Sequence, residues 1–259
     1  MGYLPDGGEA IGRSVELVET FDSLFREPLV PNKSTLLLSV AGTSFISLSA
    51  TAATIASWSI TTAFPTGAGN VPTGTTYSVG QADQGELVTG TNLSSVHALA
   101  AATYTSPSGN GSTYAFSSNN WSIGDYYQAA LSTSGFESIS VSWDQARSAT
   151  GPSSFEMIFS VNSGATWSTG VTYTVLQSGG GGALGTWNTT TYNSLYTSTQ
   201  SLAGAENASS VLVRFRALVS GASSGSNRID NVVFSGNLVP APGAIALLGL
   251  AGLIGRRRR

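Results

Sequence analysis

The sequence contains no cysteine and a single histidine, His97, among its 259 residues. The absence of cysteine excludes a disulfide framework and every thiolate metal site, and one histidine cannot build a multi-histidine zinc site. A nucleophilic site of the Ser/His/Asp type would therefore depend on His97 alone. Its neighbours Val96, Ala98 and Leu99 indicate a strand, so we expect His97 on a strand surface or in a hydrogen bond.

Charged residues are also scarce, at 10% of the chain, and they are unevenly distributed. Residues 1–29 hold six acids and two arginines, whereas 53–238 hold eight acids and four arginines. The longer segment is therefore mildly acidic and has no cluster of basic residues, which argues against binding to nucleic acid. Its many Gly, Ser and Thr residues are typical of an exported β-rich protein.

Apolar residues between Ile55 and Leu238 recur at every second position, which is the period of a strand with one buried face. Ile139, Val141 and Trp143 alternate with serines, and Trp143 is expected in the core. The same period is seen at Phe155, Met157, Phe159 and Val161, at Val171, Tyr173 and Val175, and from Val211 to Val219. Residues 228–234 are expected to form a closing strand. Weaker candidates are 54–61, 96–104, 113–117 and 126–132.

Turn-forming segments separate these runs, among them Ser106–Gly111, Asn162–Gly164 and the tetraglycine Gly179–Gly182. No run of ten or more residues keeps a helical period, and no repeat of 20–50 residues is present. Many short strands separated by turns predict an all-β fold, a single antiparallel β-sandwich over 54–238. The Gly/Thr-rich stretch 62–95 is expected to form long loops.

The N-terminal part has the layout of a secretory signal peptide that begins late. Asn32 and Lys33 precede an apolar run from Leu36 to Leu48, and Ala50-Thr51-Ala52 has the small-x-small pattern of a cleavage site. We therefore predict a signal peptide at 30–53, with cleavage after Ala52 or Ala53. Residues 1–29 are then either a mis-assigned start or a long native leader. A buried core strand is the alternative for 34–48.

The last 21 residues, 239–259, combine a Pro/Gly kink, an uncharged apolar run from Ala244 to Gly255 and four arginines. Twelve helical residues would rise only ~18 Å, which is short of the ~30 Å hydrocarbon core of a bilayer. The arginines would keep their end on the cytoplasmic side. These features predict a sorting tail with a short hydrophobic helix rather than a permanent anchor.

This tail resembles the PEP-CTERM sorting signal of exported bacterial proteins. The matching residues are Val239, Pro240, Pro242, Gly243, Arg256, Arg257, Arg258 and Arg259. The glutamate that usually lies between the two prolines is Ala241 here, so the tail is a Pro-Ala-Pro variant. The resemblance implies export through the secretion translocon, removal of the signal by signal peptidase, and processing by an exosortase-type membrane protease. The protein would be transiently membrane-associated before it reaches the cell surface or extracellular matrix.

Residues 120–235 resemble a jelly-roll module of exported bacterial proteins, including carbohydrate-binding-like domains. The resemblance rests on the order Tyr126–Gln128, Ile139–Gln145, Phe155–Trp167, Val213–Arg216 and Arg228–Val232. It implies that Asp230 in the closing strand is a candidate ligand of a structural calcium ion, with Asp125, Asp83 and backbone carbonyls completing the site. The alternative is that Asp230 caps the final turn or pairs with Arg228.

Two carboxylates, Asp144 and Glu156, are candidates for an acid/base pair of a glycosidase, which needs two carboxyl groups about 5–10 Å apart. Alternation predicts that Asp144 points outward or lies at a strand end, and that Glu156 lies on a polar face. If their two strands formed a hairpin, both would lie near Arg147, Arg214 or Arg216. Charge pairing on an exposed sheet face explains the same residues without catalysis, and we favour it.

Trp58, Trp121, Trp143, Trp167 and Trp187, together with Tyr192 and Tyr196, are more aromatic residues than one core is expected to hold. Four of them occupy Ser/Thr/Gly-rich settings: Trp167, Trp187, Tyr192 and Tyr196. These are candidates for stacking on sugar rings, although we favour the alternative, that they pack under the tetraglycine loop. The sequence predicts a non-enzymatic exported surface or matrix protein without a cofactor other than calcium. The alternatives are a carbohydrate-binding module for exopolysaccharide and a secreted glycoside hydrolase.

Overall fold

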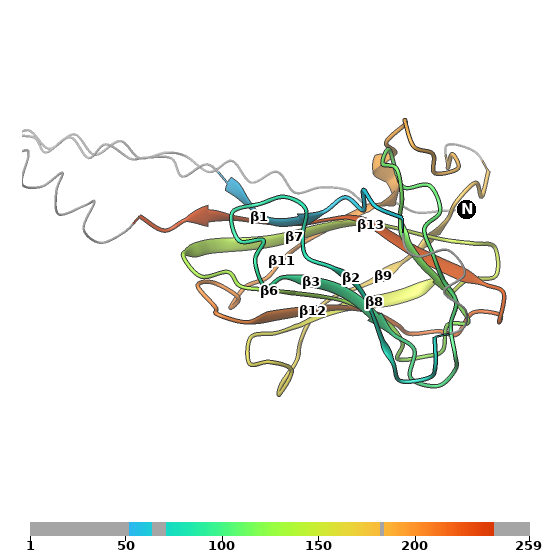
Figure 1. Cartoon of the computed structure of the whole chain (residues 1–259), viewed down its shortest axis with the longest axis horizontal. Helices are drawn as coiled ribbons and strands as arrows, with labels where there is room; N and C mark the ends of the chain where they lie inside the picture. The colour runs from blue at the N-terminus through green and yellow to red at the C-terminus, as the bar shows by residue number, and fades with distance from the viewer. Residues whose placement is uncertain (1–51, 64–70, 182–183, 241–259) are drawn as a thin grey trace, which may run out of the picture. The chain divides into compact units, whose positions relative to one another are not determined.

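The computed structural model of the chain describes residues 52–63, 71–181 and 184–240, which belong to one compact unit. These residues form an all-β sandwich of two sheets, as predicted (Figure 1). The leader, most of the signal peptide and the tail from Ala241 onward lie outside the described residues. Within the described ranges, no helix has the length and apolar character needed to cross a membrane.

One sheet has seven strands, with β7 and β13 at its centre. The strands are β1 (Ala52–Trp58), β4 (Tyr104–Thr105), β5 (Phe116–Asn119), β7 (Phe136–Arg147), β10 (Leu176–Gln177), β11 (Thr197–Ser201) and β13 (Ser226–Leu238). β1 and β5 pair with different parts of the long strand β13, while β11 and β10 pair with successive parts of β7. Among these described strands, the pairing of the two-residue strand β10 with β7 is the one parallel pairing.

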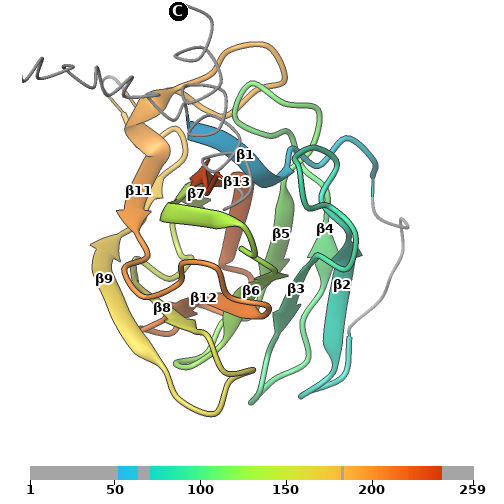
Figure 2. The same ribbon diagram turned by 90° about the vertical axis from the view of Figure 1, so that its left-hand side faces the viewer.

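The other sheet has six strands in the antiparallel order β2-β3-β6-β12-β8-β9. Their bounds are β2 (Thr76–Gly80), β3 (Asn92–Val96), β6 (Tyr126–Leu131), β12 (Val211–Ala217), β8 (Ser154–Ser160) and β9 (Ser168–Thr174). Figure 2 shows this sheet running from β9 on the left to β2 on the right. The 3-10 turn η1 (Ser194–Tyr196) immediately precedes β11.

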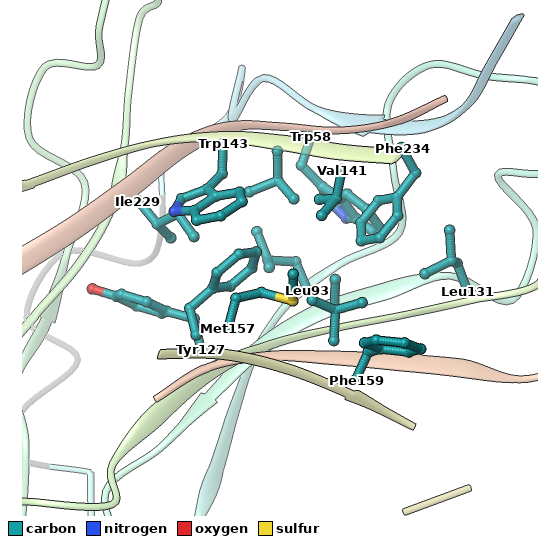
Figure 3. Close-up of a cluster of buried hydrophobic side chains, with 14 of the residues drawn as sticks. Trp58, Leu93, Tyr127, Leu131, Val141, Trp143, Met157, Phe159, Ile229 and Phe234 are labelled. Carbon is teal, nitrogen blue, oxygen red and sulfur yellow. The ribbon is translucent and has the colours of Figure 1, made fainter. Parts of the chain in front are cut away.

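The core lies between the two sheets. Figure 3 shows Trp143, Val141 and Phe234 of the seven-stranded sheet facing Met157 and other side chains of the six-stranded sheet. Trp143 is buried and packs with its ring centre 4.8 Å from that of Phe215, which confirms its predicted core position. The main core also takes in Trp58 and Trp121, so it holds more aromatic residues than we expected.

Most of the predicted strands are present, with differences at their ends. β7, β8, β9, β12 and β13 coincide with the five strongest patterns, and β1 and β6 with two of the weaker ones. Val161 and Val219 lie beyond the ends of β8 and β12 and are exposed, because each chain turns away from its sheet there. Of 96–104, only Val96 and Tyr104 lie in strands, and of 113–117 only Phe116 and Ser117.

The prediction of long loops over 62–95 is wrong for the two strands β2 and β3. Each contributes one or two apolar side chains to the interior: Leu93 is fully buried, and Tyr77 packs against the core. Their other residues are largely hydroxyl- and amide-bearing, because β2 is an edge strand and the outer face of this sheet is polar. Few apolar residues are therefore enough for a strand at this edge.

Candidate ligand-binding face

The outer face of the six-stranded sheet gathers polar and aromatic side chains in cross-strand rows. Along β6, β8 and β12, residues alternate between the buried core and this outer face. Residues paired directly across strands share a face. One row contains Glu156, Arg216, Tyr126, Val96 and Thr76, and the next contains Ile158, Arg214, Gln128, Ser94 and Ser78.

Arg214 lies at the centre of this face between two aromatic rings. Its guanidinium carbon is 4.0 Å from the ring centre of Tyr126 and 4.2 Å from that of Trp167. Nε of Arg214 donates to Oε1 of Gln128 at 2.7 Å, and burial lowers the pKa of Arg214. Cation–π contacts and a hydrogen bond thus fix one planar group. We call Tyr126, Gln128, Trp167 and Arg214 the Arg214 cluster.

Trp167 is held rigidly at the entrance to β9. Its indole Nε1 donates to the carbonyl oxygen of Gly164 at 3.1 Å, and the preceding turn is closed by Asn162 Oδ1, which accepts from the backbone N–H of Thr166. The indole is half-buried. Of the four aromatic residues predicted for sugar stacking, Trp167 is the one that lies among polar groups on a sheet face.

The other three predicted aromatic residues lie beside the seven-stranded sheet, on the other side of the sandwich from Trp167. Trp187 and Tyr196 are buried in a second small apolar cluster with Ala115 and Ala146, their rings edge to face at 5.6 Å. Trp187 and Tyr196 therefore pack in the interior, which is the role that we favoured for them. Tyr192 is exposed over 54% of its surface, and its hydroxyl hydrogen-bonds to that of Thr197.

Glu156 and Arg216 form the charge pair predicted on the exposed face, with Arg216 Nε donating to Oε1 of Glu156 at 2.7 Å. Asp144 does not belong to this set. β7 and β8 are consecutive strands, but they belong to different sheets rather than to one hairpin. Asp144 and Glu156 therefore do not lie on one sheet face. They form neither a shared charge cluster nor an acid/base pair.

Asp144 lies instead in a buried cluster over the outer side of the seven-stranded sheet. It is directly opposite Asp230 in the β7–β13 pairing, and both carboxyl groups are buried. Asp144 points outward, as predicted, but this face is not exposed there, because the segments around Asn110 and Asn193 cover this part of the sheet. Oδ2 of Asp144 accepts from Nδ2 of Asn110 and of Asn231, at 2.9 and 2.7 Å.

Asp230 is hydrogen-bonded on one oxygen only. Its Oδ2 accepts from the backbone N–H of Asn110 at 2.8 Å and from the hydroxyl of Ser112, whereas its buried Oδ1 has no hydrogen-bond partner. Burial is the main cause that raises the pKa of Asp230 from 3.8 to about 7, and the neighbouring Asp144 adds to it. Asp230 does not form an ion pair with Arg228 within 4 Å.

The three carboxylates predicted for calcium are not brought together. Asp83 accepts from the N–H and hydroxyl of Ser59, and Asp125 accepts from Ser122 and contacts His97. Within the described ranges, no group of three or more Asp, Glu or His side chains is arranged to hold a metal ion. Calcium requires six to eight oxygen ligands. Around Asp144 and Asp230 the neighbours present mainly N–H donors, so this arrangement does not fit the ion.

The residues of the Arg214 cluster other than Trp167 were not predicted as a binding site. The alternation in 211–219 does predict that Arg214 and Arg216 face away from the core, which the burial pattern confirms. The pattern of a single strand does not show which strands lie beside it. The sequence therefore could not show that β12 lies between β6 and β8. Two surface cavities are comparable in size, one of about 320 Å³ beside Tyr77 and Asp83 and one of about 330 Å³ beside Ser117 and Arg228.

Comparison with known proteins gives structural neighbours only. No family model and no curated protein matches the chain. The CBM22-1–GH10 modules of Clostridium thermocellum endo-1,4-β-D-xylanase 10B share 15% identity at a TM-score of 0.38, over 73% of this chain and 30% of that one. The CBM22-1 xylan-binding domain of Paenibacillus barcinonensis Xyn10C shares 11% identity at 0.34, over 66% and 99%. A CBM4 structure shares 13% identity at 0.26, over 62% and 94%.

Proposed function

We propose that this chain is a non-catalytic, exported surface or matrix protein whose sandwich binds polysaccharide through the outer face of its six-stranded sheet. The observation that carries the proposal is the Arg214 cluster. It combines two aromatic rings, a guanidinium group and an amide on neighbouring strands of one face. Aromatic rings stack on the apolar faces of sugars, and planar polar groups bond their hydroxyls.

A binding role agrees with the positions of the titratable side chains. Glu156 is neutralised by Arg216 on the six-stranded sheet, and Asp144 is buried in the other sheet. His97 is buried as well, away from any solvent-exposed substrate. A glycosidase requires two carboxyl groups on either side of the scissile bond, and these residues do not provide such a pair.

Affinity electrophoresis of the full chain through gels that contain single polysaccharides tests the binding face. We expect retardation by at least one polysaccharide, and a roughly tenfold weaker affinity for Trp167→Ala or Tyr126→Ala, because each loses one stacking ring. Tyr192→Ala is the control: it removes a more exposed aromatic ring from the other side of the sandwich and should bind like the parent chain. Equal losses in all three variants, or no retardation at all, would contradict the proposal.

The same polysaccharides test for turnover. Release of reducing ends by the parent chain, abolished in Glu156→Gln, would overturn the non-catalytic assignment and favour a glycoside hydrolase. We expect no release above the level of a heat-denatured control.

For export, we propose secretion through the translocon with the signal at 30–53, followed by exosortase-type processing of the tail 239–259. The position of the tail supports this, because β13 ends at Leu238 and Val239 is exposed where the tail begins. Cleavage after Val239 would leave every strand of the sandwich intact. The protein would then be released from the membrane to the cell surface or matrix.

Deletion of Pro240–Arg259 tests the sorting role in the native host. The shortened protein should fold but be misplaced, into the medium or the periplasm. Mass spectrometry of the mature parent protein should find both ends removed. An unchanged location of the deletion variant would contradict the sorting proposal and leave the binding proposal unaffected.

A further inference from the structure

The strand β9 is an edge of the six-stranded sheet, and β11 of the other sheet lies on the same side of the sandwich (Figure 2). The sequence has no charged residue between Glu156 and Glu206, a stretch that contains β9, β10 and β11. The strands on this side of the sandwich therefore carry uncharged side chains throughout, although four residues of β9 are exposed.

The edge strand β9 has little protection against pairing with another chain. Edge strands of soluble proteins usually carry a lysine, a proline or a bulge for that purpose. Of these features β9 has only a bulge, at Gly170, where a Cβ would lie 2.5 Å from Cε of Met157. The regular stretch Val171–Thr174 follows the bulge and consists of β-branched and aromatic residues, which favour strands.

The backbone of β9 presents hydrogen-bonding groups at the open edge. The N–H of Val175 donates to the carbonyl oxygen of Ser153, and hydrogen-bonded pairs occur at every second position of an antiparallel ladder. Tyr173 is therefore hydrogen-bonded to β8, whereas the N–H and C=O groups of Thr172 and Thr174 point away from it. Within the described ranges β9 pairs with β8 alone, and these outward groups have no backbone partner.

The charge pattern of β9 fits a second copy of this chain. When a strand pairs with its own copy about a two-fold axis, the same few residues of both chains come close together, and like charges opposite each other destabilise the pair. An uncharged strand avoids this repulsion. Thr172 and Thr174 lie on the outer face beside Glu156 and Ser154, so they would meet threonines of the second copy, and such cross-strand pairs are favourable.

We propose that β9 pairs antiparallel with β9 of a second copy, which joins the two six-stranded sheets into one. A register with Thr172 opposite Thr174 of the second copy, and the reverse, satisfies the outward groups of both residues. The two-fold axis is then perpendicular to the sheet, so both outer faces lie on the same side. Two Arg214 clusters on one face would hold a polysaccharide chain more tightly than one cluster. That consequence rests on the proposed function, whereas the pairing itself does not.

Sedimentation velocity of the full chain tests the pairing, in a nonionic detergent that keeps the apolar terminal segments of different molecules apart. We expect a monomer–dimer equilibrium with a dissociation constant of roughly 100 μM or below. Thr172→Pro removes an outward N–H and no bond to β8, a position that an edge strand tolerates. It should weaken the dimer at least tenfold.

Thr172→Lys is the second variant, because a lysine beside Glu156 is compatible with the folded monomer but brings two positive charges together in the dimer. It should also weaken the dimer at least tenfold. Circular dichroism of both variants should match that of the parent chain.

Thr199→Pro is the matched control on β11. The N–H of Leu202 donates to the carbonyl oxygen of Ile139, so by the same alternation the N–H of Thr199 points away from β7. This variant should dimerise like the parent chain. A parent chain that stays monomeric up to millimolar concentration, a dimer unchanged in both Thr172 variants, or an equal loss in Thr199→Pro would overturn the proposal. Oligomers larger than a dimer would overturn the two-fold pairing.

Tyr126→Ala separates self-association from polysaccharide binding, because Tyr126 belongs to the Arg214 cluster and lies on β6, away from the edge. It should dimerise like the parent chain while it loses affinity for polysaccharide. A parent chain that binds no polysaccharide but still dimerises through β9 would contradict the proposed function and leave the pairing in place.

Discussion

Nδ1 of His97 lies 3.0 Å from Oδ2 of Asp125, and the two side chains are 2% and 0% exposed. The other ring nitrogen, Nε2, lies 3.0 Å from the hydroxyl of Ser118. This is the order of contacts in a Ser/His/Asp triad. Ser118 is buried as well, and the ring of Trp121 lies 4.6 Å from that of His97. The three side chains link β5 to the segment that follows β3 and to the segment that precedes β6.

Asp125→Ala is expected to destabilise the fold by about 3–5 kcal/mol, because it removes the partner of a buried polar group and leaves others unsatisfied. The lost carboxylate accepts from the backbone N–H groups of Ala98 and Ser122, at 2.8 and 2.6 Å, besides contacting His97. Urea unfolding followed by tryptophan fluorescence measures the change. Arg216→Gln breaks the partly exposed pair with Glu156 and should cost less than about 1 kcal/mol. Similar losses in the two variants would contradict the structural role given to Asp125.

The stability of the protein is expected to fall as the pH rises from about 4 to about 7, because the folded state keeps a proton on Asp230 that the unfolded state releases. Burial raises the pKa of Asp230 from 3.8 to about 7, so the folded state binds more protons in that range. The slope of unfolding free energy with pH is then negative. The stabilisation is fully present below pH 3.8 and is lost above pH 7, a change of up to about 4 kcal/mol.

Asp230→Asn isolates this contribution, since the amide keeps the shape of the carboxyl group and does not titrate. Urea midpoints at pH 5 and pH 8 should differ less in the variant than in the parent chain. The variant should also be the more stable of the two at pH 8. If the stability of the parent chain changes between pH 5 and pH 8 no more than that of the variant, the raised pKa of Asp230 is contradicted.

Gly109→Ala is expected to destabilise the sandwich by roughly 1–3 kcal/mol, the usual cost of forcing an extra methyl into a packed site. A Cβ at this position would overlap the hydroxyl of Ser112 and Oδ2 of Asp230, the two groups that hydrogen-bond to each other. Gly185→Ala is the matched control, because its nearest neighbour, Nδ2 of Asn193, is 4.0 Å away. Differential scanning calorimetry should show a lower melting temperature for the first variant only.

The strands could be predicted because a two-residue period directly reports one buried face. Val211, Val213 and Phe215 alternate with Arg214 and Arg216 as expected, and β7 keeps the same alternation up to Trp143. The period fails at residues 143–146, which are all buried, because other segments cover the outer side of the sheet there. The pattern of one strand predicts that Asp144 points outward, but it contains no information about the segments that cover this side of the sheet.

The candidate site depended on strand order, which local patterns do not contain. Tyr126, Arg214 and Trp167 are far apart in the sequence and meet because β6 and β8 flank β12 and the turn before β9 folds over β12. Trp187 and Tyr196 show the converse. Their Ser/Thr/Gly-rich surroundings are compatible with exposure as well as with packing, and both rings pack against Ala115 and Ala146. Small side chains are common in loops, but they also leave space in which an aromatic ring can be buried.

Calcium is expected to leave the melting temperature of the protein unchanged, because the N–H donors around Asp144 and Asp230 occupy positions that an ion would need for oxygen ligands. Nδ2 of Asn231 donates to Oδ2 of Asp144, and of the four carboxyl oxygens of Asp144 and Asp230 only Oδ1 of Asp230 has no partner. Melting curves with EDTA and with several millimolar calcium chloride, compared with magnesium chloride at the same concentration, measure the effect. A calcium-specific, saturable rise that is absent in Asp230→Asn would establish the ion at this position. The amide groups of Asn110 and Asn231 would then have to turn their oxygens toward the ion.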